Sequence, residues 1–230
     1  MIPKKIHYCW FGRGEKPKLA KKCLASWKKY CPDYEIIEWN EDNFDVHQNP
    51  YVEYLYANKK YAFLSDYARL LIIYENGGIY FDTDVEVIKP IDDLLDNHAY
   101  FGFETPDYIN TGLGFGAEKN HAIIKELLKE YEPYLDGLHG YKGCPVLNTE
   151  ALLKNGLIKG GETQSIGTVT IYSPDYFNPY DDPTGRLNIT DNTYSIHWFA
   201  KTWMTRSKRI RSRLTKPYHR LLSFLSSRGS

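Results

Sequence analysis

The fold is decided by the segment Ile79-Tyr80-Phe81-Asp82-Thr83-Asp84-Val85-Glu86-Val87-Ile88, in which apolar and β-branched residues flank two carboxylates. Such a run predicts a strand whose side chains alternate between faces, so Asp82 and Asp84 are expected to point the same way. Two carboxylates in an apolar setting need a counter-charge, and carboxylate oxygens suit Mg²⁺ or Mn²⁺ better than zinc. The segment therefore predicts a strand that ends at a site for a metal and a diphosphate, with two solvated carboxylates in an edge loop as the alternative.

The segment 62–78, which precedes this strand, predicts a helix. Its apolar residues recur at helical spacing, at Phe63, Tyr67, Leu70, Leu71 and Tyr74. Gly77-Gly78 supplies the stop. Asp66 and Arg69 are three residues apart and share one face of the helix. They predict either a local surface ion pair or a polar pair that binds sugar hydroxyls.

The chain opens with a β-α-β pattern. A strand over 4–12 ends in a glycine turn, a helix follows over 16–31, and a second strand covers 34–39. The Gly-x-Gly-x-x-Gly pattern is absent after the first strand, which disfavours a dinucleotide fold. In open α/β sheets ligands bind beyond the carboxyl ends of strands. Trp10 stands at such an end and predicts either a platform for a nucleobase or a core tryptophan.

A second group of polar residues lies in the segment 194–203. A strand delivers His197, and Lys201 and Trp203 follow closely. An imidazole can complete a Mn²⁺ shell begun by carboxylates. An ammonium can neutralise a diphosphate, and an indole N–H can donate to a phosphate oxygen. The alternative is a buried histidine with tryptophans that pack around it.

Three motifs together resemble the core of glycosyltransferase family 32. They are Ser65-Asp66-Tyr67-Ala68-Arg69, Gly77-Gly78-Ile79-Tyr80 and Asp82-Thr83-Asp84. This family includes fungal α-mannosyltransferases and bacterial capsule or lipopolysaccharide sugar transferases, and its core resembles the glucosylating domain of large clostridial toxins. The first strand is similar to the opening strand of these enzymes at Ile6, His7, Trp10 and Gly12.

The resemblance implies an α/β fold of the GT-A type, with a mixed, mainly parallel central sheet flanked by helices. It predicts a catalytic domain over 1–204, followed by a tail over 205–230. It further implies a metal-dependent transferase that moves a hexose, with retention of configuration, from a nucleoside-diphosphate sugar to a glycan or lipid-linked acceptor in surface polysaccharide synthesis. Mn²⁺ or Mg²⁺ is the expected cofactor, and a UDP-hexose is favoured over GDP-mannose.

The resemblance also assigns roles to individual residues. The metal ligands are Asp82, Asp84 and His197. The residues that bind the donor are Trp10, Asp66, Arg69, Asn110, Lys201 and Trp203. The catalytic set is Asp82, Asp84, Asp66 and Arg69. The glycine-rich stretch 110–117 is expected to pack near the donor sugar, with a phosphate cradle as the alternative. Cys144 interrupts a segment similar to the family's Gly-Pro…Thr, so no site residue is expected there.

Composition sets limits on partners and location. The 230 residues suit one domain, and the zero net charge argues against a polyanion binder, so no nucleic-acid partner is expected. The four cysteines lack zinc spacing and are expected to be free thiols. The N-terminus shows no leader pattern and no apolar run spans a bilayer, which predicts a cytoplasmic protein.

The tail from Thr205 onward has no acidic residue, and its basic side chains alternate with apolar ones. This pattern predicts contact with the inner face of the plasma membrane, with a frayed terminus as the alternative. Two other functions stay open from the sequence: a metal-dependent nucleotidyl- or phosphotransferase, and a sugar-binding module without catalysis.

Overall fold

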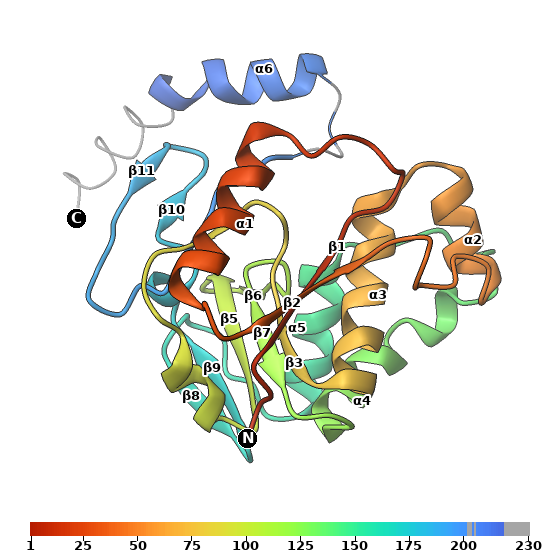
Figure 1. The fold of residues 1–230 in the computed structure, drawn as a ribbon, viewed down its shortest axis with the longest axis horizontal. Helices are drawn as coiled ribbons and strands as arrows, with labels where there is room; N and C mark the ends of the chain where they lie inside the picture. Colours follow the sequence, from red (N-terminus) through yellow and green to blue (C-terminus); the bar gives the residue numbers. More distant parts are fainter. Residues whose placement is uncertain (202–203, 205, 219–230) are drawn as a thin grey trace.

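An eight-stranded central sheet organises the computed structural model, which describes residues 1–201, 204 and 206–218 (Figure 1). Its strand order is β2-β1-β3-β7-β5-β9-β8, and β6 pairs with β5. The strands are β1 (Lys5–Cys9), β2 (Glu35–Trp39), β3 (Gly78–Tyr80), β5 (Ala99–Thr105), β6 (Tyr108–Ile109), β7 (Phe115–Ala117), β8 (Gln164–Ile166) and β9 (Val169–Tyr172). Strand β1 is parallel to β2 and β3, and β5 is parallel to β9. Strand β7 runs antiparallel between β3 and β5, which keeps these two in the same direction. Five strands thus run one way and β6, β7 and β8 the other, as predicted.

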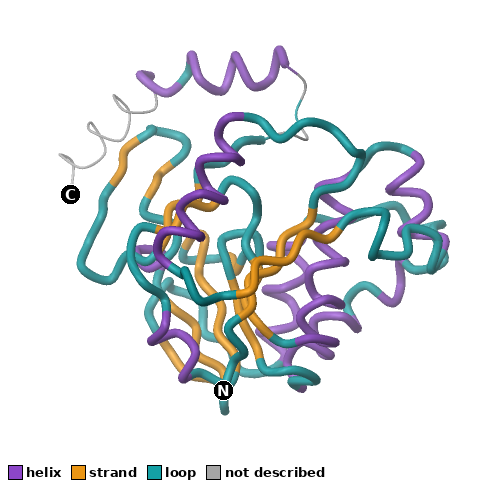
Figure 2. The backbone as a smooth tube through the Cα atoms, viewed as in Figure 1, coloured by secondary structure: helices purple, strands orange, loops and turns teal. Residues whose placement is uncertain are grey.

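Helices cover both faces of this sheet (Figures 1 and 2). Helices α2 (Pro50–Ala57), α3 (Tyr61–Asn76), α4 (Ala122–Lys129) and α5 (Cys144–Lys154) lie on one side, and α1 (Lys18–Tyr30) lies on the other. Strand alternation divides the core accordingly. Tyr80 and Phe101 pack with the α3 side, whereas their neighbours Ile79 and Tyr100 pack with the α1 side.

Two helices show how the sequence produces these layers. In α1 the buried residues are Ala20, Cys23 and Trp27, at the three- and four-residue spacing of one helical face, and lysines occupy half of the other positions. Helix α3 carries buried residues along most of its length and ends at Gly77, whose φ of 65° suits glycine. The chain then enters β3 directly, so the end of α3 fixes where the central strand begins.

The prediction of one continuous strand over 79–88 is wrong. The chain leaves the central sheet after β3, and β4 (Val85–Val87) pairs with β12 (Ser195–His197) in a separate two-stranded sheet. Asp82, Thr83 and Asp84 lie in the connection between the sheets, where the amide of Val85 donates to the carbonyl of Asp82 at 3.0 Å. A turn that crosses between two sheets cannot keep the strand alternation on which the sequence argument depended.

The remaining described elements surround the sheet edges. They are η1 (Asp92–Asp96), η2 (Glu132–Tyr134), η3 (Pro174–Tyr176), the hairpin β10 (Tyr180–Asp181) with β11 (Arg186–Leu187), and α6 (Arg206–Leu214). Helix α6 lies outside the body of the fold, beyond the hairpin and α1 (Figure 1). The domain boundary at 204/205 stays a prediction. The four cysteines are free and buried, as expected. Among the residues that the structure describes, none of the helices has the length and apolar character needed to span a bilayer.

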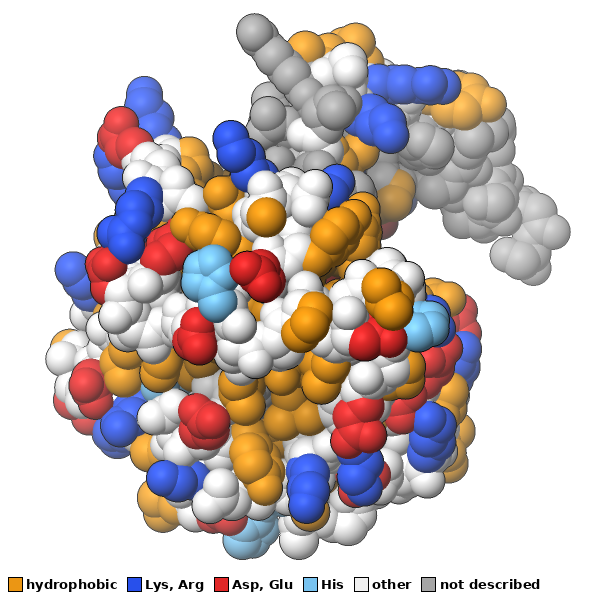
Figure 3. Space-filling view, turned by 90° about the vertical axis from the view of Figure 1, so that its right-hand side faces the viewer, with side chains coloured by type: hydrophobic (Ala, Val, Ile, Leu, Met, Phe, Trp, Pro, Cys, Tyr) orange, Lys and Arg blue, Asp and Glu red, His pale blue; other side chains and the backbone are white. Residues whose placement is uncertain are grey.

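The face that carries α2 to α4 presents a hollow lined by hydrophobic side chains between groups of charged ones (Figure 3). The predicted site is instead built where the carboxyl ends of β1, β2 and β3 meet the connection to β4.

Candidate active site

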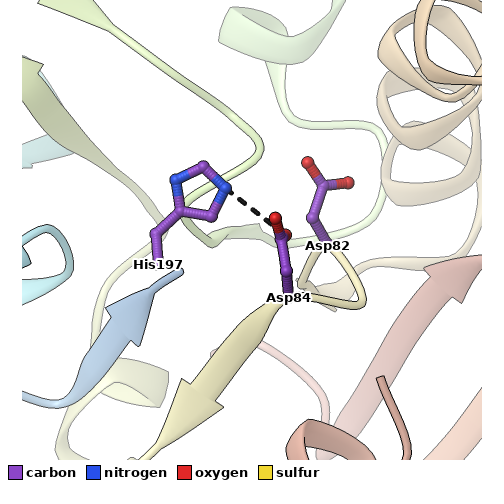
Figure 4. A group of neighbouring side chains, drawn as sticks. All are labelled: Asp82, Asp84 and His197. Carbon is purple, nitrogen blue, oxygen red and sulfur yellow. Dashed lines mark ion pairs between the residues drawn. The ribbon is translucent and has the colours of Figure 1, made fainter. Parts of the chain in front are cut away.

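Asp82, Asp84 and His197 come together between the central sheet and the small sheet. Their ligand atoms all lie within 4.8 Å of one another, although 113 residues separate Asp84 from His197 along the chain. Asp84 stands at the start of β4 and His197 at the end of its antiparallel partner β12, where the pairing joins His197 to Val85. Figure 4 shows the imidazole turned toward Asp84, with Asp82 on the far side of the Asp84 carboxylate. The three predicted metal ligands are therefore neighbours in the fold.

Asp84 is held in place by contacts from the β12 side. His197 Nε2 lies 3.3 Å from Asp84 Oδ1, and the amide of Ala200 donates to Asp84 Oδ2 at 2.7 Å. Burial alone would raise the pKa of Asp84, but the charge and hydrogen bond of His197 and the amide of Ala200 outweigh it, so the pKa is lowered. Burial likewise opposes protonation of His197, yet the neighbouring Asp84 raises its pKa above the usual range. The second carboxylate of the motif is therefore ionised at neutral pH.

Arg69 links the other carboxylates of the site. Its Nη2 lies 3.0 Å from Asp66 Oδ1 and 3.0 Å from Asp82 Oδ1. Arg69 itself is only 2% exposed. The hydroxyl of Tyr80 also donates to Asp82 Oδ1, at 3.0 Å. Burial raises the pKa of Asp82 to about 6, since Arg69 only partly offsets burial and Asp84 adds like charge. The local ion pair expected from the sequence is thus part of a buried network that includes the Asp-x-Asp motif.

The loop after β6 brings Asn110 to this network. Its Oδ1 accepts from the amide of Gly112 at 2.7 Å, and its Nδ2 donates to Glu104 Oε2 at 2.9 Å. A Cβ at Gly112 would lie 2.4 Å from Asp82 Oδ2, 3.0 Å from Asn110 Oδ1 and 3.2 Å from Arg69 Nη1. Gly112 therefore occupies the point where a predicted metal ligand, Asp82, meets two predicted donor residues, and only a residue without a side chain fits there.

Cys144 is a site residue that the sequence did not predict. Its backbone amide, at the first position of α5, donates to Asp66 Oδ2 at 3.2 Å, and its Sγ lies 3.7 Å from Arg69 Nη1. The partial positive charge of a helix N-terminus stabilises a carboxylate in this position. Pro145 at the second position of a helix is the one sequence signal for this helix start, and it gives no indication of the contact with α3.

Trp10 lines a separate cleft of about 290 Å³ at the carboxyl ends of β1 and β2. Its indole N–H donates to the carbonyl of Gly14 at 2.7 Å, and Lys16 Nζ lies 5.4 Å from the centre of the ring. Glu38 and Asn40 line the same cleft. Trp10 is thus partly exposed beside polar groups, in the position expected of a nucleobase platform.

The last two predicted donor residues lie after β12. Lys201 forms an ion pair with Asp182, which also binds Lys216 at 3.2 Å. A contact between Lys201 and a diphosphate stays a prediction. Trp203 lies outside the described residues.

The donor set fits a hard divalent cation. Two carboxylates and one imidazole are suitable ligands for Mn²⁺, and ligands on opposite sides of such an ion are separated by roughly 4.2 Å at a bond length of about 2.1 Å. The observed upper limit of 4.8 Å therefore requires only a small inward movement of the side chains. Nδ1 of His197 is buried without a hydrogen-bond partner within the part of the chain that the structure describes.

Comparisons with known proteins find similarity to glycosyltransferases. Residues 17–101 match the family described as "Glycosyltransferase sugar-binding region containing DXD motif". Inositol phosphoceramide mannosyltransferase 3 of Schizosaccharomyces pombe is 27% identical over 146 residues, which cover 60% of this chain and 39% of that protein. Human alpha-1,4-N-acetylglucosaminyltransferase is 35% identical over 127 residues, covering 54% of this chain and 33% of that protein.

A solved structure supports the fold. The protein described as "PaToxG Glycosyltransferase" superposes with a TM-score of 0.54 at 23% identity, over 66% of this chain and 69% of that chain. The chain spans less than half the length of the two curated relatives, and the residues that match the family include the Asp-x-Asp motif. Residues 17–101 are therefore similar to the sugar-binding region of DXD-containing glycosyltransferases, the class of enzyme that the sequence motifs indicated.

Proposed function

We propose that this protein is a metal-dependent glycosyltransferase that moves a hexose from a nucleoside-diphosphate sugar to a glycan or lipid-linked acceptor. The observation that carries the proposal is the convergence of Asp82, Asp84 and His197 beside the buried network of Arg69 and Asp66. The first group suits a cation and a diphosphate, and the second suits sugar hydroxyls. The cleft lined by Trp10, which is proposed to hold the nucleobase, lies at the same edge of the sheet.

The donor would lie across this edge. Its base would stack on Trp10, and its sugar hydroxyls would bind Asp66, Arg69 and Asn110. A divalent cation held by Asp82, Asp84 and His197, Mn²⁺ or Mg²⁺, would supply positive charge against the diphosphate. Lys201 and Trp203 are proposed as further contacts with the phosphates. Fixed groups of this kind favour the reaction because they are oriented before the bond breaks.

The transfer is proposed to retain the configuration of the sugar by a front-side course. The bond between the anomeric carbon and the diphosphate oxygen breaks, and its electron pair leaves with that oxygen. The acceptor hydroxyl oxygen bonds to the anomeric carbon on the same face, and its proton passes to the departing phosphate. The engagement of Asp66 and Asp82 by Arg69, and of Asp84 by His197, supports this course over attack by one of these carboxylates.

For the donor we propose a UDP-hexose, with GDP-mannose as the second candidate. The relatives' names include a mannosyltransferase and an N-acetylglucosaminyltransferase, so the shared sugar-binding region is compatible with more than one sugar. The name of the S. pombe relative contains a ceramide lipid, which supports a lipid-linked acceptor. Synthesis of surface polysaccharide is the proposed setting.

Helix α6 supports a location at the cytoplasmic face of a membrane. Ile210 and Leu214 on α6, and Tyr218 beyond its end, recur every fourth residue and are 47%, 75% and 61% exposed. Lys208 and Arg211 are exposed beside them, and the segment 205–230 contains no acidic residue. An exposed apolar stripe among basic side chains suits the surface of anionic lipids. We expect the protein to sediment with vesicles that contain phosphatidylglycerol and not with pure phosphatidylcholine vesicles, and Ile210→Ser with Leu214→Ser to abolish that difference.

The experiment that tests the activity is release of nucleoside diphosphate from a panel of UDP- and GDP-hexoses in Mn²⁺ and in chelator. We expect release with one donor class, dependent on metal and reduced at least a hundredfold by Asp84→Ala. Release of inorganic phosphate or pyrophosphate instead would favour a phosphotransferase or nucleotidyltransferase. Donor binding unchanged by chelator and by Asp84→Ala, without release, would favour a sugar-binding module.

A further inference from the structure

An aromatic surface lies on the rim of the candidate site and is not used by any of the roles above. It consists of Phe63, near the start of α3, and Tyr141, in the loop that leads to α5. The ring centres are 4.2 Å apart with an angle of 47° between the planes. Tyr141 is 37% exposed and Phe63 is partly buried against the core. Lys60 Nζ lies 5.8 Å from the Tyr141 ring.

Both residues are tied to Asp66 by short stretches of chain. Phe63 and Asp66 are three residues apart on α3, so they are neighbours on one helix face, about 4.5 Å apart along the axis. Phe63 and Asp66 are partly exposed, whereas the helix residues Leu64, Ser65 and Tyr67 are buried. Tyr141 lies three residues before Cys144, so their Cα atoms are at most about 10 Å apart. The amide of Cys144 in turn donates to Asp66 Oδ2. The aromatic surface therefore adjoins the carboxylate proposed to bind the donor sugar.

The loop that carries Tyr141 has the composition of a ligand-binding segment. It contains Gly137, Gly140 and Gly143, and the first two have φ values of 75° and 71°. Leu138 in the same loop is 83% exposed. At Gly140 a Cβ would have no neighbour within 4 Å, so the backbone there is open to solvent. The loop thus joins the site at its Cys144 end and exposes apolar side chains.

We propose that Phe63 and Tyr141 form the subsite for the acceptor sugar, and that a pyranose ring packs its apolar C–H face on them. This inference rests on the proposed glycosyl transfer. The acceptor hydroxyl must reach the anomeric carbon of a sugar bound by Asp66 and Arg69, so the acceptor must occupy the surface next to Asp66. The exposed surface there is aromatic, and large rigid rings supply contact area at low cost in conformational entropy.

The test separates binding of the acceptor from turnover of the donor. Methyl glycosides of glucose, galactose and mannose serve as acceptor probes in saturation-transfer NMR, and nucleoside diphosphate release without acceptor reports the donor site. For Tyr141→Ala we expect loss of at least four-fifths of the saturation transfer to the best probe, with acceptor-free release unchanged within twofold. Tyr141→Phe should retain both signals. Tyr54→Ala, which removes a tyrosine that is 41% exposed on α2, is the matched control and should retain both.

The contrary outcomes are distinct. If saturation transfer persists in Tyr141→Ala and in Phe63→Ala, or if no probe receives any, the acceptor subsite is not on this surface. If Tyr141→Ala lowers acceptor-free release as much as it lowers probe binding, the tyrosine supports the donor site and the inference is also overturned. If the unaltered protein releases no nucleoside diphosphate from any donor, the proposed function itself fails, and the acceptor role fails with it.

Discussion

Arg69 and Asp82 are joined by a hydrogen-bonded ion pair of 3.0 Å that links helix α3 to the first carboxylate of the Asp-x-Asp motif. The guanidinium is almost fully buried and also binds Asp66 at 3.0 Å. The helix thereby helps to position the motif, together with the Tyr80 hydroxyl and the Gly112 carbonyl, which also bind Asp82. Because one buried guanidinium binds two partly buried carboxylates, changes at Arg69 should affect stability as well as sugar binding.

We predict that Arg69→Ala lowers the free energy of unfolding by about 3–5 kcal/mol, because it removes a buried cation and leaves two partly buried carboxylates without their partner. Arg69→Lys should restore part of the stability, since a lysine keeps the charge without the forked geometry. Urea denaturation of the purified variants measures the difference. Arg13→Ala is the control, because its pair with Asp42 is exposed and its loss should change stability little. Equal effects at the two arginines would contradict the buried role of Arg69.

Gly112→Ala should damage the site more than the fold. A Cβ there would lie 2.4 Å from Asp82 Oδ2, so that carboxylate must shift. We expect donor turnover to fall by about 10²-fold, the effect of a displacement of roughly 1 Å in a reacting site. The melting temperature should change by only a few degrees in a thermal scan.

Gly167→Ala, in the turn between β8 and β9, is the control for Gly112→Ala, because a Cβ at Gly167 has no neighbour within 4 Å and the residue has no proposed role in binding. It should leave donor turnover within a factor of about two. If Gly112→Ala also leaves turnover unchanged, then Asp82 tolerates displacement and does not take part in the reaction.

Stability should fall in mild acid because of His7. Trp39 Nε1 donates to His7 Nδ1 at 3.0 Å, so the ring proton lies on Nε2 and donates to the Gly77 carbonyl, also at 3.0 Å. Burial lowers the pKa of His7 to about 4, against about 6.5 in the unfolded chain. Between these values the unfolded state binds the extra proton, so the neutral ring stabilises the fold above pH 6.5 and this contribution is lost as the pH falls toward 4.

Protonation of His7 should lower the free energy of unfolding by about 3 kcal/mol between pH 6.5 and pH 4, since each unit of pKa difference corresponds to about 1.4 kcal/mol. Urea denaturation at pH 7 and pH 4 for the unaltered protein and for His7→Gln isolates the contribution from those of the acidic residues. We expect the pH dependence to be smaller in His7→Gln. The same pH dependence in both proteins would show that His7 is protonated in the folded state.

Trp10→Ala should weaken binding of the free nucleoside diphosphate by about 5- to 150-fold, since stacking of a base on an aromatic ring contributes about 1–3 kcal/mol. Trp10→Phe should retain most of the affinity. Titration calorimetry with UDP and with GDP provides the measurement and identifies the preferred base. A dissociation constant that Trp10→Ala leaves unchanged would show that the cleft at β1 and β2 does not hold the base.

The sequence was most informative where neighbouring residues determine the structure. The spacing of Phe63, Tyr67 and Leu70 predicted α3, and Gly77 predicted its end, because helix periodicity and glycine conformation are local properties. The β-α-β opening followed from the same kind of pattern, and the mixed sheet flanked by helices was implied by the resemblance to a family. The resemblance to a family then predicted that Asp84 and His197 would meet, although 113 residues separate them in the chain.

What could not be predicted depends on contacts between elements. Asp82 and Asp84 lie close together because of a turn between two sheets. The sequence argument also expected them to be close, but it derived this from the alternation of side chains along a strand, which does not apply to a turn. The contact of Cys144 with Asp66 arises where α5 begins beside α3, and the close approach at Gly112 is visible only once Asn110 and Arg69 are placed. Neither leaves a periodic pattern in the sequence.

The metal site can be observed directly by anomalous diffraction. A crystal of the unaltered protein, soaked with Mn²⁺ and a nucleoside diphosphate and measured above the manganese edge, should show one strong peak within about 2.2 Å of a carboxylate oxygen of Asp84, next to His197 and the phosphates. The same soak of Asp84→Ala should lose that peak. A manganese peak and bound nucleotide elsewhere, with the turn at Asp82 to Asp84 empty in the unaltered protein, would contradict the assignment of this site.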